Sequence, residues 1–320
     1  MVVEGEGMSW IALVAAMGIA GYLFICWLTG ENLLVVWWDE WRLSGVSLER
    51  VAEIAATKSL ESGLVVTLTT IPSRIDSLGP TIKSLLRQTA RAREIRLCVP
   101  AWSKRENCSY DVPAWLRQLP GVTIVSCEDQ GPATKFLSTL RAVALDQAVV
   151  VVDDDRVYHP RLLECLATLA AAYPEEVLSA AGWDAPSDRT DRPTTLWARL
   201  TAAPYVPLRG NQVRRARWVD IVQGVHGYVV RPRFFDLAAL SDFSAAPAAV
   251  RWVDDVWISA HCRVAKRVHP LALEFTDYQP RAHARRYDRT SLGRNFNRAT
   301  NDVLRGNSVA LRFFSDRWRR

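Results

Sequence analysis

The longest apolar stretch of the chain lies near its start, where residues 7–30 carry no charged side chain. As an α-helix, these positions would reach about 36 Å at 1.5 Å per residue, enough to cross a hydrocarbon core of about 30 Å. Trp10 and Trp27 lie near its two ends, and further tryptophans follow at 37, 38 and 41. We therefore predict a single-pass membrane anchor with an interfacial segment over residues 1–40.

Two alternatives to an uncleaved anchor are an apolar helix buried in the domain and a cleaved signal peptide. The apolar stretch has no basic segment before it and no A-x-A-like site after it, which favours the anchor over the signal peptide. Arg42, Arg50 and Lys58 follow the stretch, so the positive-inside rule predicts that the large C-terminal part lies in the cytoplasm. The sequon at 107–109 is a counter-signal, and the Golgi lumen is the alternative location.

Short apolar runs then recur at 64–69, 94–99, 122–126 and 148–152. Helical patterns with Pro near the first turn separate them, at 80–88 and 132–142. Near-continuous apolar strands that alternate with helices predict an α/β domain with a mostly parallel sheet, covered on both faces. Ligands of such sheets bind beyond the carboxyl ends of the strands, which directs attention to residues 69–74 and 153–155.

Composition and charge narrow the class of protein further. The chain has 320 residues, 49% of them hydrophobic, and a net charge of +6. The last forty residues hold eleven Arg and three Asp, so this tail carries +8 and the rest of the chain −2. The six cysteines are scattered without C-x-x-C spacing, which favours neither a disulfide framework nor a zinc site. Neither a P-loop nor G-x-G-x-x-G occurs, which argues against Walker-type NTPases and dinucleotide-dependent oxidoreductases.

The most informative polar cluster is Asp153–Asp154–Asp155, directly after the fourth apolar run. Three adjacent carboxylates repel one another unless a cation or several hydrogen bonds neutralise them. Mg²⁺ or Mn²⁺ typically takes one or two such carboxylates and completes its shell with water and phosphate oxygens. The alternative is a strand-end loop in which the Asp side chains accept hydrogen bonds from local backbone.

Six motifs in this order resemble bacterial glycosyltransferases of the GT-A superfamily, close to its family-two-like group. They are VVTLTTIPSRI, SLLRQT, CEDQGPATKFLSTL, VVVDDDRVYHP, VHGYVVRPRFFD and WVDDVWISAHC, and the resemblance runs from Leu64 to Cys262. It implies a Rossmann-like α/β/α sandwich with a mixed, mostly parallel sheet, a nucleotide-sugar donor and a D-x-D metal motif. The implied catalytic domain spans 60–275, and an Arg-rich extension, 276–320, packs on or near it.

The resemblance also assigns roles to residues of this sequence. It implies that Asp153 and Asp155 hold Mn²⁺ or Mg²⁺, and that Asp255, ahead of Asp254, is the catalytic base. The implied contacts to the nucleotide sugar are Thr69, Thr70, Ser73, Arg74, Lys135, Asp153 and Asp154. Two of these assignments have structural alternatives. Lys135 is nearly as well suited to the first turn of a helix on the surface, and Asp254 and Asp255 are suited to capping the N-terminus of a helix.

Histidines and tryptophans add smaller expectations. Some relatives of this fold add a late histidine to the metal, and His283 is the candidate here. His226 stands where the resembled enzymes have a small residue, which puts the shape of the acceptor side in doubt. We expect core packing for Trp183, Trp218, Trp252 and Trp257.

The expected function is metal-dependent transfer of a sugar from a nucleotide-diphosphate donor to a glycan, lipid or protein hydroxyl, with inversion. The membrane is a further partner through the N-terminal helix, and no nucleic acid is expected. A sugar nucleotidyltransferase is the enzymatic alternative, although the glycine-rich basic loop usual in such enzymes is missing. The non-enzymatic alternative is a membrane-tethered scaffold that binds anionic partners through the Arg-rich tail.

Overall fold

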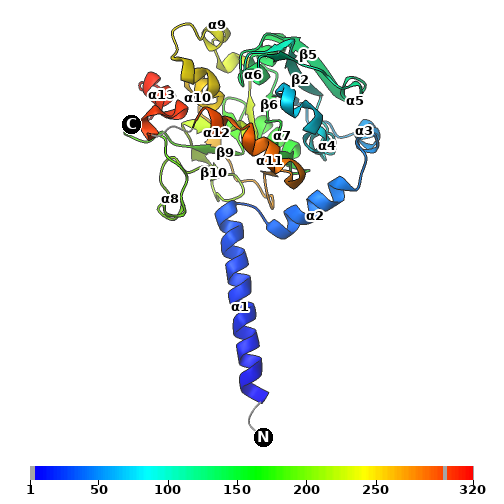
Figure 1. The fold of residues 1–320 in the computed structure, drawn as a ribbon, viewed down its shortest axis with the longest axis vertical. Coiled ribbons are helices and arrows are strands. Elements are labelled where there is room, and N and C mark those ends of the chain that lie inside the picture. Colours follow the sequence, from blue (N-terminus) through cyan, green and yellow to red (C-terminus); the bar gives the residue numbers. More distant parts are fainter. Residues whose placement is uncertain (1–3, 298–300, 320) are drawn as a thin grey trace.

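A long N-terminal helix projects from an α/β domain in the computed structural model, which describes residues 4–297 and 301–319 (Figure 1). This helix, α1 (Glu4–Thr29), contains the segment Trp10–Thr29, whose mean hydropathy is 2.2 and which no other part of the protein buries. Its length and composition fit a single membrane span, and a signal sequence near an N-terminus has the same features.

The end of α1 is joined to the domain by hydrogen bonds. Gly30 follows the helix with φ +70°. Its carbonyl accepts a hydrogen bond from Asn211 Nδ2 at 2.7 Å, and the Trp27 carbonyl accepts one from Gln212 Nε2 at 2.7 Å. The next residue, Glu31, lies 3.4 Å from Arg209 Nη1. These contacts fix the direction in which the domain leaves the helix.

An eight-stranded mixed sheet forms the centre of the domain, in the order β11-β14-β8-β13-β6-β1-β2-β5. The strands are β1 (Val65–Thr69), β2 (Glu94–Pro100), β5 (Val122–Cys127), β6 (Val149–Val151), β8 (Val177–Ser179), β11 (Arg217–Trp218), β13 (Tyr228–Val230) and β14 (Lys266–Val268). The four apolar runs thus form the four neighbouring parallel strands β5, β2, β1 and β6. β13 lies antiparallel to both of its neighbours, which makes the sheet mixed.

Helices cover both faces of the sheet because successive strand residues point to opposite sides. Val65, Val149 and Val151 face one core cluster together with α6 (Thr134–Ala142) and α10 (Asp254–His261). The alternate residues of β1 and β6 face a second cluster with α4 (Gly79–Leu86) and α7 (Leu162–Ala172). The predicted α/β architecture with two covered faces is confirmed.

Shorter elements complete the domain. α2 (Leu33–Ser44) and α3 (Leu48–Ala56) connect α1 to β1, and Val51 and Ala52 of α3 are buried in the core, so the packed domain begins before residue 60. The short strands are β3 (Trp102–Ser103), β4 (Cys108–Ser109), β7 (Val157–Tyr158), β9 (Ala181–Trp183), β10 (Leu208–Arg209), β12 (Ile221–Val222) and β15 (Asp277–Tyr278). The short α-helices are α5 (Ala114–Arg117), α8 (Leu196–Leu200), α9 (Leu237–Ser241), α11 (Ala284–Arg289) and α12 (Leu292–Asn295). Turns of 3₁₀ helix lie at Pro72–Ser77, Gly224–His226, Pro232–Phe234, Ala248–Trp252, Arg281–His283 and Asp302–Leu304.

The Arg-rich C-terminal tail packs against the domain. Its last helix, α13 (Gly306–Phe313), buries Ala310 and Leu311 in the same core cluster as α6 and α10. Several tail arginines pair with acids of the domain, among them Arg305 with Asp191 at 3.0 Å. The tail is therefore part of the folded unit within the described residues.

Candidate functional site

A cavity of about 420 Å³ opens at the carboxyl ends of β1 and β6. These strands are neighbours at the centre of the sheet, although they are far apart in the chain. After β1 the chain continues to β2 on one side, and after β6 it continues to the other side, on which β13 lies. Open α/β sheets bind ligands at the point where the connections change direction in this way. The described lining residues lie within 69–74, 103–110, 129–135, 153–155, 223–225, 252–255 and the tail segment 291–307.

The three consecutive acids after β6 point in different directions. Asp154 is buried and faces β1, where it accepts hydrogen bonds from Thr70 Oγ1 at 2.6 Å and Arg74 Nη1 at 2.9 Å. Asp155 Oδ2 lies 3.3 Å from the same guanidinium nitrogen. Burial and the charge of Asp154 raise the pKa of Asp155 to about 6, against the opposing attraction of Arg74. Asp154 and Asp155 thus share Arg74 as a partner.

Arg74 binds protein groups with each of its nitrogens. Beside the two carboxylates, its Nε donates to Thr290 Oγ1 at 2.7 Å and its Nη2 donates to the Tyr287 carbonyl at 3.1 Å. The guanidinium thus links the acid cluster to α11 of the tail. These contacts use four of its five N–H donors, so the second N–H of Nη2 is the donor left for the ligand contact that the resemblance implies.

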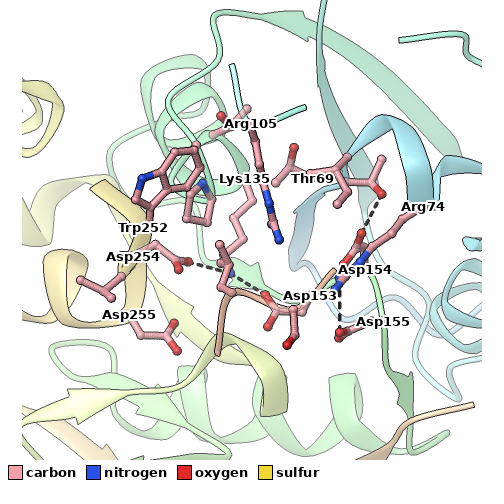
Figure 2. Close-up of a pocket in the computed structure, with 18 of the residues that line it drawn as sticks. Thr69, Arg74, Arg105, Lys135, Asp153, Asp154, Asp155, Trp252, Asp254 and Asp255 are labelled. Atoms are coloured by element: carbon pink, nitrogen blue, oxygen red, sulfur yellow. Dashed lines mark hydrogen bonds and ion pairs between the residues drawn. The ribbon is translucent and has the colours of Figure 1, made fainter. Parts of the chain in front are cut away.

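Lys135 lies between two acidic segments at the base of the cavity (Figure 2). Its ammonium donates to Asp153 Oδ1 at 2.5 Å and lies 2.8 Å from Asp254 Oδ2, an ion pair without hydrogen-bond geometry. Burial alone would lower the pKa of Lys135, but the neighbouring carboxylates outweigh it and raise this pKa well above its usual value. Lys135 therefore lies in the first turn of α6, as the alternative expected, but its side chain is buried between acids and is not on the surface.

The acidic pair at the start of α10 forms the wall opposite Arg74. Asp255 Oδ1 accepts a hydrogen bond from the Gly224 amide at 3.0 Å. Burial and the charge of Asp254 raise the pKa of Asp255 well above its usual value, although Lys135 acts in the opposite direction. Among the residues that the structure describes, no side chain caps α10 at its N-terminus, and both carboxylates line the cavity. A raised pKa at a cavity wall is what a general base requires.

The carboxylates of Asp153 and Asp155 are compatible with a divalent cation only if further ligands complete its shell. Within the described residues, no three His, Cys, Asp or Glu side chains are grouped as a ready-made metal site. Mg²⁺ and Mn²⁺ need only one or two protein carboxylates when a diphosphate supplies further oxygens. In this part of the chain, the contacts to Lys135 and Arg74 engage only one oxygen of Asp153 and one of Asp155, and both carboxylates line the cavity.

The cavity brings together most of the residues that the sequence predicted. Thr69, Thr70, Arg74, Lys135, Asp153, Asp154, Asp155, Asp254 and Asp255 all line it. Ser73 does not, because its hydroxyl and its amide donate to the carboxylate of Glu106. His283 is also absent from the lining, and its ring lies edge-on to Tyr287 with 5.8 Å between centroids. The structure therefore does not support these two residues as site residues.

His226 and the tryptophans also have clear positions. His226 is buried, and its Nδ1 lies 2.5 Å from Asp277 Oδ2. Trp183 and Trp257 pack in the core as expected. Trp218 is exposed beneath the guanidinium of Arg267, and Trp252 lines the cavity while its other face stacks on Phe296 at 4.4 Å. The core prediction was thus wrong for Trp218 and Trp252.

Several cavity residues were not predicted from the sequence. Arg105 extends toward the cavity from the loop after β2 (Figure 2). Asp129 follows β5 and accepts hydrogen bonds from the amides of Lys104 and Gly131, at 2.5 and 2.6 Å. The rule that ligands bind beyond parallel strands also applies to the ends of β2 and β5, and it would have indicated both residues. No such signal exists for the tail residues Ser291 and Asn307, which also line the cavity.

No family model matches this chain, and a search of the curated proteins found no match either.

Proposed function

We propose that the protein is a glycosyltransferase that moves a sugar from a nucleotide-diphosphate donor to an acceptor hydroxyl. One observation supports this function above all. A single cavity at the carboxyl ends of β1 and β6 holds Asp153 and Asp155, whose carboxylates suit a divalent cation, opposite the half-buried Asp255, whose raised pKa suits a base. A donor diphosphate bound with the metal would thus face a proton acceptor across the same cavity.

The arrangement of the sheet supports a GT-A form of the α/β fold. The parallel strands β5, β2, β1 and β6 make a Rossmann-like half with the cavity at its edge. The antiparallel β13 then leads toward α10, which presents Asp254 and Asp255 to the site. Sugar transfer requires a nucleotide-binding half and an acceptor-binding half that meet at one cavity.

The proposed reaction is a single displacement. The acceptor oxygen forms a bond to the anomeric carbon as the bond from that carbon to the diphosphate oxygen breaks, and the configuration inverts. The acceptor proton passes to Asp255, and the bonding electrons leave with the nucleoside diphosphate. A bound metal would neutralise charge on the departing diphosphate. Lys135 and Arg105 are the cationic side chains of the cavity that would add to this stabilisation.

A role for the tail as an anion-binding arm has less support. Arg294, Arg305 and Arg319 pair with Asp288, Asp191 and Asp184 of the protein itself. Ser291 and Asn307 of the tail line the cavity, which supports a role for the tail in closing the site.

The proposal is tested by thermal denaturation of the full chain in detergent with nucleoside diphosphates, with and without Mn²⁺. A ligand that binds the native state raises the melting temperature, by mass action. We expect at least one nucleoside diphosphate to raise it in a Mn²⁺-dependent way, and Asp153→Asn and Asp155→Asn to abolish the shift. The matched control is Asp188→Asn, since Asp188 is an exposed residue paired with Arg192 outside the cavity. No Mn²⁺-dependent shift with any base would overturn the proposal.

A further inference from the structure

Helix α2 has a buried face that fixes its orientation on the domain. Val36 and Leu43 are buried, and Asp39 between them accepts hydrogen bonds from Arg87 Nη1 at 2.7 Å and from the Tyr278 hydroxyl at 2.9 Å. Asn32 caps the helix by accepting a hydrogen bond from the Val35 amide. With this face held by the domain, the opposite face cannot turn inward.

The opposite face of α2 is apolar and exposed. Its large side chains recur at the i, i+3, i+4, i+7 spacing of one helix face: Leu34, Trp37, Trp38 and Trp41, which are 65%, 52%, 50% and 59% exposed. We call these four residues the tryptophan stripe. Soluble proteins rarely leave such a contiguous apolar face in water, so the stripe requires a partner.

A second exposed apolar group lies on α8, far away in the sequence. Leu196, Trp197 and Leu200 are 51%, 73% and 51% exposed, while Ala198 is buried and holds the helix to the domain. Figure 1 shows α8 and α2 on either side of the upper end of α1, at the same end of the domain. Both apolar groups are thus at the level where the apolar helix α1 meets the domain.

Basic side chains occur at the same level. Asn211 and Gln212 contact the end of α1, and the exposed Arg214 and Arg215 follow directly in the same loop. The acids of α2 are turned away from the stripe, since Glu40 pairs with Arg281 and Asp39 with Arg87. Tryptophan beside arginine is the composition of surfaces that bind the headgroup layer of anionic membranes.

We propose that the tryptophan stripe and the apolar face of α8 insert into the interfacial layer of the bilayer that α1 spans. The observation that selects lipid as the occupant is continuity. α2 and α8 lie on either side of the end of α1, which among the described residues is the helix long and apolar enough to cross a membrane, and the arginines follow the loop residues that contact this end. The domain would then have three contacts with the membrane, which set its tilt relative to the bilayer, whereas with α1 as the single contact the helix and the domain joined to it could tilt together. This inference is independent of sugar transfer.

The test uses the full chain in lipid nanodiscs of phosphatidylcholine and phosphatidylglycerol with brominated acyl chains, which quench nearby tryptophan fluorescence. The variants are Trp37→Ser/Trp38→Ser/Trp41→Ser for the stripe and Trp197→Ser for α8. The control is Trp102→Ser, because Trp102 is as exposed as Trp37, at 52%, and lies in β3, two residues after the end of β2. Figure 1 shows β2 away from α1. Trp10 and Trp27 of α1 remain in every variant as an internal reference.

Six tryptophans would contact the bilayer, so we expect the stripe variant, which lacks three of them, to lose about half of the emission that brominated lipid quenches. Trp197→Ser should lose a smaller part. Trp102→Ser should lose none of it. If the quenched emission of either variant equals that of the wild type while Trp10 and Trp27 stay quenched, the corresponding contact is overturned and insertion of α1 stands. A second copy of the chain covers the surface if brominated lipid does not quench the stripe in discs that hold one chain, and if cysteines placed in the stripe cross-link two chains. That result would also overturn the proposal.

Discussion

The ammonium of Lys135 lies 2.8 Å from Asp254 Oδ2, so it links the first turn of α6 to the first turn of α10 across the candidate site. The same ammonium contacts Asp153 Oδ1, and one buried cation therefore balances acids from two distant segments. Without it, Asp153, Asp254 and Asp255 would repel one another in a poorly solvated cavity. Lys135 thus positions the acids on which the proposed reaction depends.

Replacing Lys135 should destabilise the fold. Because Lys135→Met leaves buried carboxylates without their cation, we expect the free energy of unfolding to fall by about 3–5 kcal/mol. Denaturant unfolding of the full chain in detergent measures the change. The control is Arg50→Met, which removes a solvent-exposed pair with Glu53 and should cost about 0–1 kcal/mol. Equal losses in the two variants would contradict a special role for Lys135.

Replacing Asp255 should separate donor binding from transfer. We expect Asp255→Asn to lower kcat by about 10²–10⁴-fold, because only the proton acceptor is lost, with an unchanged Kd for the nucleoside diphosphate. Asp242→Asn, at an exposed turn, should leave both quantities unchanged. Normal turnover of Asp255→Asn would assign this residue to the start of α10 alone.

Gly224 has no side chain, which leaves room for the charged cluster of Lys135, Asp153 and Asp255. A Cβ there would come within 2.9 Å of Lys135 Nζ and 3.3 Å of an oxygen of both Asp153 and Asp255. We expect Gly224→Ala to displace these groups and to lower kcat/KM at least tenfold, with little loss of melting temperature. Gly79→Ala is the matched control, since its Cβ would meet nothing within 4 Å. Unchanged kinetics of Gly224→Ala would mean that the cluster tolerates displacement.

Asp277 should make stability depend on pH in the acid range. Burial would raise the pKa of Asp277, but Arg156 and His226 outweigh it and hold this pKa well below the usual value. The carboxylate therefore stabilises the fold at any pH above about 4, the unfolded value, and this contribution is lost as the pH falls further.

At pH 7 we expect Asp277→Asn to lower the free energy of unfolding by about 3–5 kcal/mol, because Arg156 is left buried without its partner. The difference from the wild type should shrink below pH 4, where the unfolded Asp277 takes up a proton. Unfolding at a series of pH values measures this, with the exposed Asp146→Asn as the control. A difference that does not change with pH would show that packing alone is responsible.

The amino-acid sequence by itself determined the apolar helix, the four parallel strands and the edge of the sheet at which the cavity lies. These features depend on local periodicity, and parallel strands bring their carboxyl ends together wherever they pair. Thr70, Arg74 and Asp154 were therefore predictable as neighbours, and the structure places them in contact.

Only the tertiary structure decided which partner each polar group has. Ser73 lies one residue from Arg74 but turns to Glu106, and Trp252 faces the cavity while the nearby Trp257 is buried. The tail closes the site through Thr290 and Ser291, although nothing in its composition distinguishes it from a solvated basic segment. Contacts between distant segments depend on the packing of the whole chain, and the local spacing of residues does not predict them.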